Sequence, residues 1–107
     1  MIECPDFLPL GSVVRLRGSR KTMMVIGRAL VMTKDDGGKE YYDYSLALYP
    51  EGLIGDAVVY SNHDCIDEVL FEGYRDDEDA RVLSEIAEIL PKMTVPKADP
   101  QPQQEEW

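Results

Sequence analysis

A change in the hydrophobic period near Tyr74 is the feature that most constrains what this chain can fold into. Before Tyr74, short apolar or alternating runs are separated by segments that contain Gly, Pro or Asp. After Tyr74, apolar residues recur at the three- and four-residue spacing of an amphipathic helix. Strands that all precede a single helix do not make the alternating βαβ pattern, so the sequence predicts a mainly β (α+β) domain with a C-terminal helix.

The part of the chain before Tyr74 is expected to form about five strands. The first begins near Ser12, and the others are expected over residues 22–33, 40–48, 57–60 and 67–72. The second run is apolar enough to be buried on both faces, and Gly27 within it predicts a bulge or a sharp bend. Tyr49 to Gly52, with Pro second and Gly fourth, matches a type I turn. The expected architecture is a small, strongly bent antiparallel sheet or an SH3-like, partly open barrel.

One helix is expected over about residues 77–90. The carboxylates of Asp76 to Asp79 offer N-capping oxygens and place negative charge at the positive end of the helix. Pro91 closes the helical segment. A helix of this length is marginal alone and needs a surface on which to pack.

The chain is expected to form a single domain over residues 1–91, because 107 residues suit one small domain. Residues 92–107 contain several Pro and Gln and little apolar content, which predicts a disordered tail. Trp107 at its end is interpreted as an idle tail residue, although an exposed Trp could also anchor a partner.

Charge is distributed unevenly along the chain, whose formal net charge is −10. Residues 1–34 carry a net +4, residues 35–74 carry −9 and residues 75–107 carry −5. Arg15 and Arg17 share one face of the first strand, but the net field repels polyanions, so nucleic-acid binding is not expected. The alternative, that the N-terminal bases pair across the sheet with the acids of the middle segment, is favoured.

The N-terminal and apolar segments give no indication of membrane insertion or export. The longest apolar stretch is interrupted by Arg28 and is too short to span a membrane, and residues 1–6 are acidic where a secretory signal is basic. The sequence therefore predicts a soluble, cytoplasmic protein in which Cys4 and Cys65 are reduced thiols.

No arrangement of side chains suggests catalysis, a metal site or a cofactor. The sole histidine, His63, lies only two residues from Cys65, whereas Cys-His dyads usually join residues that are distant in sequence. A metal site would need Cys4 as a third ligand beside His63 and Cys65, but Cys4 is distant in sequence and the three do not show the paired spacing of metal ligands. The favoured interpretation is that Asn62 or Asp64 caps a short turn before the fifth strand, with Cys65 as a small buried hydrophobe.

Tyrosines suggest a protein-binding surface. All six lie between Tyr41 and Tyr74, and tyrosine provides large amphipathic contact area at low entropic cost. Tyr41 and Tyr49 fall on the strand face opposite Tyr42 and Tyr44, so one of these faces is exposed or both are covered. Tyr41, Tyr49 and Tyr74 are the candidate partner-binding residues.

Four stretches, together covering about residues 8–74, resemble a known family of small proteins. They are Leu8-Pro9-Leu10-Gly11-Ser12-Val13-Val14, Tyr42-Asp43-Tyr44, Leu48-Tyr49-Pro50-Glu51-Gly52, and Asn62-His63 with Ile66-Asp67-Glu68-Val69 and Phe71-Glu72-Gly73-Tyr74. That family has no known biochemical activity and is encoded in Gram-positive bacteria beside LXG-type toxins of the type VII secretion system. The chain departs from the family pattern at Asp64-Cys65, where the family is usually polar.

The resemblance implies a cytosolic accessory protein, an adaptor or chaperone whose partner is an LXG-type toxin or a secretion component. It assigns no catalytic residue. An alternative hypothesis is an immunity protein that neutralises a cognate toxin, because an acidic surface suits a basic nuclease cleft. A third, a small enzyme that uses His63 and Cys65, is the least favoured.

Overall fold

The computed structural model describes residues 2–98, which form one five-stranded antiparallel sheet and a C-terminal helix. The mainly β fold with a partly open sheet, predicted from the sequence, is confirmed. In chain order the elements are β1 (Val13–Leu16), β2 (Thr22–Thr33), β3 (Lys39–Leu48), β4 (Val58–Ser61), the 3₁₀ turn η1 (His63–Cys65), β5 (Ile66–Phe71), α1 (Asp77–Ile89) and the 3₁₀ turn η2 (Leu90–Lys92).

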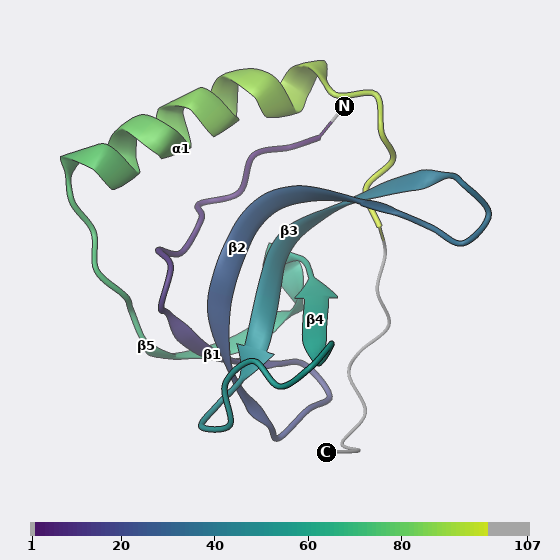
Figure 1. The fold of residues 1–107 in the computed structure, drawn as a ribbon. Coiled ribbons are helices and arrows are strands. Elements are labelled where there is room, and N and C mark those ends of the chain that lie inside the picture. The colour runs from purple at the N-terminus through teal and green to yellow at the C-terminus, as the bar shows by residue number, and fades with distance from the viewer. Residues whose placement is uncertain (1, 99–107) are drawn as a thin grey trace.

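The strands are ordered β4-β3-β2-β1-β5 in the sheet. The first and last strands in sequence are therefore neighbours, and β4 and β5 are the two edges. All four pairings are antiparallel. β2 is long and strongly curved, so it bends the sheet around the core without closing it (Figure 1).

The bend in β2 coincides with the bulge predicted at Gly27. The register with β3 shifts between Val25 and Gly27, and Gly27 lies opposite Ser45. A Cβ at Gly27 would collide with the Ser45 hydroxyl, so only glycine leaves room for this close approach. Beyond the bulge β2 loses most of its burial, as at Val31, which is 39% exposed. The expected burial of both faces is wrong there, because the β2–β3 hairpin extends past the rest of the sheet (Figure 1).

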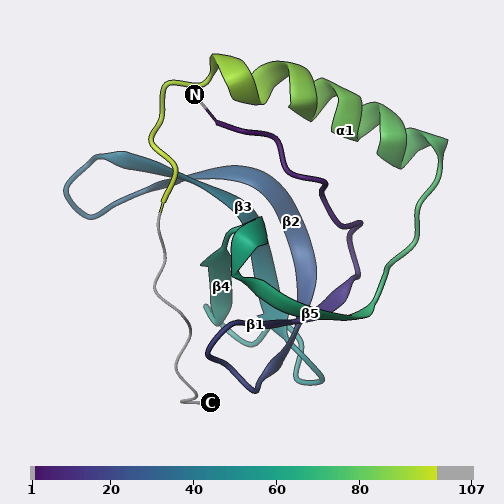
Figure 2. The same ribbon diagram turned by 180° about the vertical axis from the view of Figure 1, so that it is seen from behind.

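The N-terminal segment lies between α1 and the sheet (Figures 1 and 2). Ile2 and Phe7 are each 2% exposed, and the Phe7 ring contacts the Tyr44 ring edge-on at 5.6 Å. The amide of Ile2 donates a hydrogen bond to the carbonyl of Leu90, 3.1 Å away. The helix has no fully buried residue, and it packs on the core through the partly buried Leu83 and residues near it. The segment is thus a middle layer that joins the helix to the sheet.

The helix begins at the predicted cap. The Asp76 side chain accepts a hydrogen bond from the Asp79 amide at 2.9 Å, which confirms the capping predicted from the acidic run. The carboxylate of Asp79 forms an ion pair with Arg28 of β2 at 2.8 Å, and their side chains are only 13% and 7% exposed. Arg28 also donates to the carbonyl of Leu8. One guanidinium therefore joins β2, the N-terminal segment and the first turn of α1.

Two local predictions are wrong. The turn after β3 is not a type I turn over residues 49–52, because the Gly52 amide bonds to the carbonyl of Leu48 at 2.7 Å, which closes a wider loop. The predicted tail does not begin at residue 92, because Met93 and Val95 pack against the core and Ala98 is 5% exposed. The folded unit extends at least to Ala98, and the rest of the predicted tail, with Trp107, lies outside the described residues.

Replacing Gly27 by Ala tests the close approach of β2 and β3. Gly27 does not have a positive φ, so the added methyl group is opposed by the Ser45 hydroxyl and not by the backbone conformation. We expect Gly27→Ala to lower the free energy of unfolding by about 1–3 kcal/mol, measured by urea denaturation.

The matched control is the same change in a Ser45→Ala background, where the opposing oxygen is absent. There Gly27→Ala should cost about 1 kcal/mol less than in the wild type. An equal loss in both backgrounds would contradict this account of the bulge.

Candidate functional site

A buried carboxylate lies where β3, the end of β4 and the C-terminal segment meet. Asp43 is 0% exposed. One oxygen accepts a hydrogen bond from the Tyr41 hydroxyl at 2.8 Å, and the other accepts one from the His63 amide at 2.9 Å. That second oxygen also lies 3.3 Å from the Lys97 ammonium. Burial of a charge is costly unless it is paired and hydrogen-bonded, and here both conditions hold.

Asn62 links the same three elements through its amide. Its oxygen accepts a hydrogen bond from the Asp43 amide at 2.8 Å, and its nitrogen donates to the carbonyl of Ala98 at 2.6 Å. The expected capping role is wrong in detail, because no side chain caps η1. The turn is closed instead by the Cys65 amide, which bonds to the Asn62 carbonyl at 3.0 Å.

The hydroxyl of Tyr44 extends this network toward the N-terminal segment. It accepts a hydrogen bond from the Leu8 amide at 2.9 Å and hydrogen-bonds to Nδ1 of His63 at 2.8 Å. Burial raises the pKa of Tyr44 to about 12. Burial and the hydrogen bond to Asp43 raise the pKa of Tyr41 as well. Both phenols are thus held in the neutral, donating form.

The cluster gives no sign of a reactive centre. His63 contacts Tyr44, whereas the Cys65 thiol lies near the carboxylate of Asp64 at 3.8 Å. Among residues 2–98, no group of three or more His, Cys, Asp or Glu side chains is placed to hold a metal ion. Cys4 and Cys65 are both free thiols.

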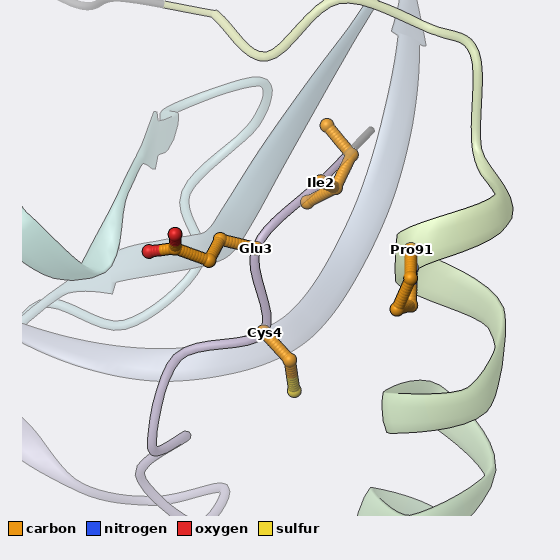
Figure 3. A pocket seen from close by; sticks show the side chains of 4 residues that line it. All are labelled: Ile2, Glu3, Cys4 and Pro91. Atoms are coloured by element: carbon orange, nitrogen blue, oxygen red, sulfur yellow. The ribbon is translucent and has the colours of Figure 1, made fainter.

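A shallow depression of about 400 Å³ lies where the N-terminal segment meets the 3₁₀ turn η2. It is lined by Ile2, Glu3, Cys4 and Pro91 (Figure 3). Burial raises the pKa of the Cys4 thiol, and the charges of Asp43 and Asp6 raise it further. The reactive thiolate is therefore disfavoured at this position.

The three candidate tyrosines lie in different environments. Tyr41 is 0% exposed and is part of the buried cluster, so it does not belong to a surface, and its expected contact role is corrected. Tyr49 is 48% exposed and Tyr74 is 80% exposed. Of the two alternatives for the third strand, coverage of both faces holds for its second half, where every residue from Asp43 to Leu48 is buried.

Apolar side chains are exposed on the edge strand β5. Val69, Leu70 and Phe71 are 45%, 41% and 61% exposed. β5 pairs with β1 on one side, and two register shifts interrupt that pairing. Leu10, which is 50% exposed, precedes β1 and its carbonyl lies close to Gly73. We call Leu10, Val69, Leu70, Phe71 and Tyr74 the β5 surface.

Sequence reasoning named Tyr74 but missed the rest of the β5 surface. The sequence places Val69 and Phe71 on one face of the expected strand and Leu70 on the other. In the structure both faces of β5 are exposed. A second exposed apolar group, Leu53 and Ile54 at 61% and 57%, lies in the loop that also carries Tyr49.

Two of the basic residues near the N-terminus are paired with acids of the middle segment, as predicted for the N-terminal bases. Arg15 of β1 contacts Glu68 of β5 at 3.3 Å, and Lys21 contacts Glu51 at 2.6 Å. These two pairs join the positive segment to the acidic middle segment across the sheet. Such exposed pairs contribute little stability, but they neutralise the charges that a polyanion would contact.

Comparison with known proteins identifies the family. The family model described as "Domain of unknown function (DUF4176)" matches residues 7–82, which span all five strands and the first turns of α1. The chain belongs to this family. A search of curated proteins found no match, and neither did a search of solved structures. Among the helices that the structure describes, none has the length and apolarity to cross a membrane.

The raised pKa of Tyr44 predicts a loss of stability in alkaline solution. The folded-state pKa of about 12 lies above the ordinary tyrosine pKa of 10.0, so the stabilisation is complete below pH 10 and is lost as the pH rises to 12. Urea unfolding of Tyr44→Phe should show a weaker fall in stability over this range, by up to about 3 kcal/mol.

Tyr49→Phe serves as the control, because it removes the same hydroxyl from an exposed position. Its pH dependence should match that of the wild type. Indistinguishable alkaline slopes for Tyr44→Phe and the wild type would show that the Tyr44 hydroxyl is not held neutral by the fold.

Proposed function

We propose that this protein is a non-enzymatic accessory factor, an adaptor or chaperone, that binds an LXG-type toxin of the type VII secretion system in the cytoplasm. The resemblance of four segments to proteins encoded beside such toxins supports the identity of the partner. The observation that carries the binding role is the β5 surface, where large apolar side chains remain in solvent on an edge strand.

The β5 surface has the composition of a protein interface. Exposed apolar patches on small soluble proteins often mark binding sites. Phe71 and Tyr74 are 61% and 80% exposed and offer aromatic contacts, which tend to dominate interface energy. Arg15 and Glu68 form an ion pair on the neighbouring strands and supply a polar rim. A stable complex would bury about 1,200–2,000 Å² in total.

The polar side chains of the buried cluster are hydrogen-bonded within the protein, which also favours binding over catalysis. Asp43, Tyr41 and Asn62 are fully or nearly fully buried and bond to one another or to backbone groups. His63 and Cys65 each have a different partner. The groups that a hydrolytic or transfer reaction would need are therefore committed to holding the fold.

The alternative role as an immunity protein rests on the acidic middle segment. Part of that charge is already compensated, because Asp43 is buried beside Lys97 and Glu51 and Glu68 are paired with Lys21 and Arg15. Growth of cells that express the toxin domain distinguishes the two roles, because an immunity protein protects them and an adaptor does not.

Substitution of Phe71 and Tyr74 tests the β5 surface. The full chain is co-expressed with an LXG-type toxin, and the complex is measured by size-exclusion chromatography and calorimetry. We expect Phe71→Ala and Tyr74→Ala each to weaken binding by about tenfold or more, equivalent to about 1.4 kcal/mol.

Tyr49→Ala is the matched control, since Tyr49 is also an exposed tyrosine but lies in the β3–β4 loop. It should bind as the wild type does. Separate elution of the two wild-type proteins would count against the proposed function, and loss of binding only with Tyr49→Ala would move the interface to that loop.

A further inference from the structure

The edge of β3 is shared between β4 and the C-terminal segment. β4 pairs with β3 only from Tyr44 to Ala47. Farther toward the start of β3, the same edge is occupied by residues 96–98, which pair with Tyr41 in a parallel bridge. In Figure 1 this yellow segment passes beside β3 where the hairpin leaves the sheet. Residues 96–98 thus take the position of an added strand.

The contacts between the segment and its site are few and specific. The Tyr41 amide donates to the carbonyl of Pro96, and the Ala98 amide donates to the carbonyl of Tyr41, both at 2.9 Å. Asn62 donates to the carbonyl of Ala98 at 2.6 Å, and Lys97 reaches Asp43 at 3.3 Å. Main-chain bonds of this kind hold added strands in general, while one side-chain contact supplies the selectivity.

The receiving groups are buried, and they are bonded to one another as well as to the segment. Asp43 is 0% exposed and Asn62 is 2% exposed. The Asp43 carboxylate is oriented by the Tyr41 hydroxyl and the His63 amide, and the Asn62 oxygen is fixed by the Asp43 amide. The occupant is by contrast short and partly in solvent, with the Lys97 side chain 34% exposed. This is the asymmetry of a preformed site and a ligand.

The buried charge limits what can replace the segment. Among the described residues, Lys97 is the one that forms an ion pair with Asp43. If residues 96–98 leave, the carboxylate keeps its two hydrogen bonds but loses its cation, which is unfavourable for a buried charge. A replacement strand must therefore bring its own ammonium or guanidinium group to this position.

We propose that Asp43, Asn62 and the open edge of β3 form a binding site for an extended peptide that carries a lysine, and that residues 96–98 occupy it in cis. A lysine-bearing strand of the protein partner takes the same place by displacing them. This proposal rests on the proposed function, since the competing strand belongs to the bound protein. The site on β3 is a second contact with the partner, selective for sequence, near the edge of the sheet that lies opposite β5.

The test uses the full chain with its own segment weakened. Lys97→Met removes the cation, and Ala98→Pro removes the amide that bonds to Tyr41. The probe is a fluorescent synthetic peptide with the sequence of residues 93–98, and its control carries Lys97→Ala. Binding is followed by fluorescence anisotropy, and the folded state of the double variant is checked by circular dichroism.

We expect the lysine peptide to bind the double variant at least about tenfold more tightly than the control peptide. Asp43→Asn in the same background should remove this preference. Equal affinity of the two peptides, or no saturable binding by a folded double variant, would overturn the proposal. If the double variant is unfolded, Lys97→Met alone is used, and displacement is read from faster hydrogen exchange of the chain's own Ala98 amide, which loses its bond to the Tyr41 carbonyl, on addition of the lysine peptide.

A parallel measurement with the LXG protein separates this proposal from the proposed function. If the LXG protein binds and the lysine peptide competes with it, both are supported. If it binds but the peptide neither binds nor competes, the site on β3 is wrong and the accessory role stands. If the peptide binds while the LXG protein does not, the partner strand and the accessory role are both overturned.

Discussion

The buried carboxylate of Asp43 is the interaction that holds three segments of the chain together. Because it has no access to solvent, its charge must be compensated inside the protein. The groups that do so are the hydroxyl of Tyr41, the amide of His63 and the ammonium of Lys97. The need to satisfy one charge thus brings the start of β3, the end of β4 and the C-terminal segment to the same point, with Asn62 as a second link.

A second buried charge pair joins the helix and the N-terminal segment to the sheet. Arg28 in β2 contacts Asp79 in the first turn of α1 and the carbonyl of Leu8 in the N-terminal segment. The helix rests on that segment, which contributes Phe7 to the core. Polar pairs therefore set where the helix and both terminal segments lie, while apolar contacts supply most of the driving force for folding. The apolar side chains of the β5 surface belong to neither network.

Much of the fold could be predicted because local patterns and tertiary structure agree. The apolar run from 22 to 33 became β2, Gly27 became its bulge and Asp76 became the helix cap. The candidate site was harder to predict from the sequence. Tyr41 looked like a contact residue by composition, and its burial follows from core packing with residues distant in sequence, such as Ile2 and Leu90. The sequence feature that could have indicated the buried cluster is the single acid Asp43 between two tyrosines in the predicted strand.

The sequence by itself determined the order of the elements, the bulge at Gly27 and the cap of α1 at Asp76, because these depend on residues close together in the chain. Tertiary structure alone decided which polar groups are buried together, that residues 93–98 are part of the folded unit, and that β5 is exposed on both faces. Those outcomes depend on contacts between segments tens of residues apart, such as Asp43 with Lys97, and no local pattern of apolar and polar residues encodes such a pairing.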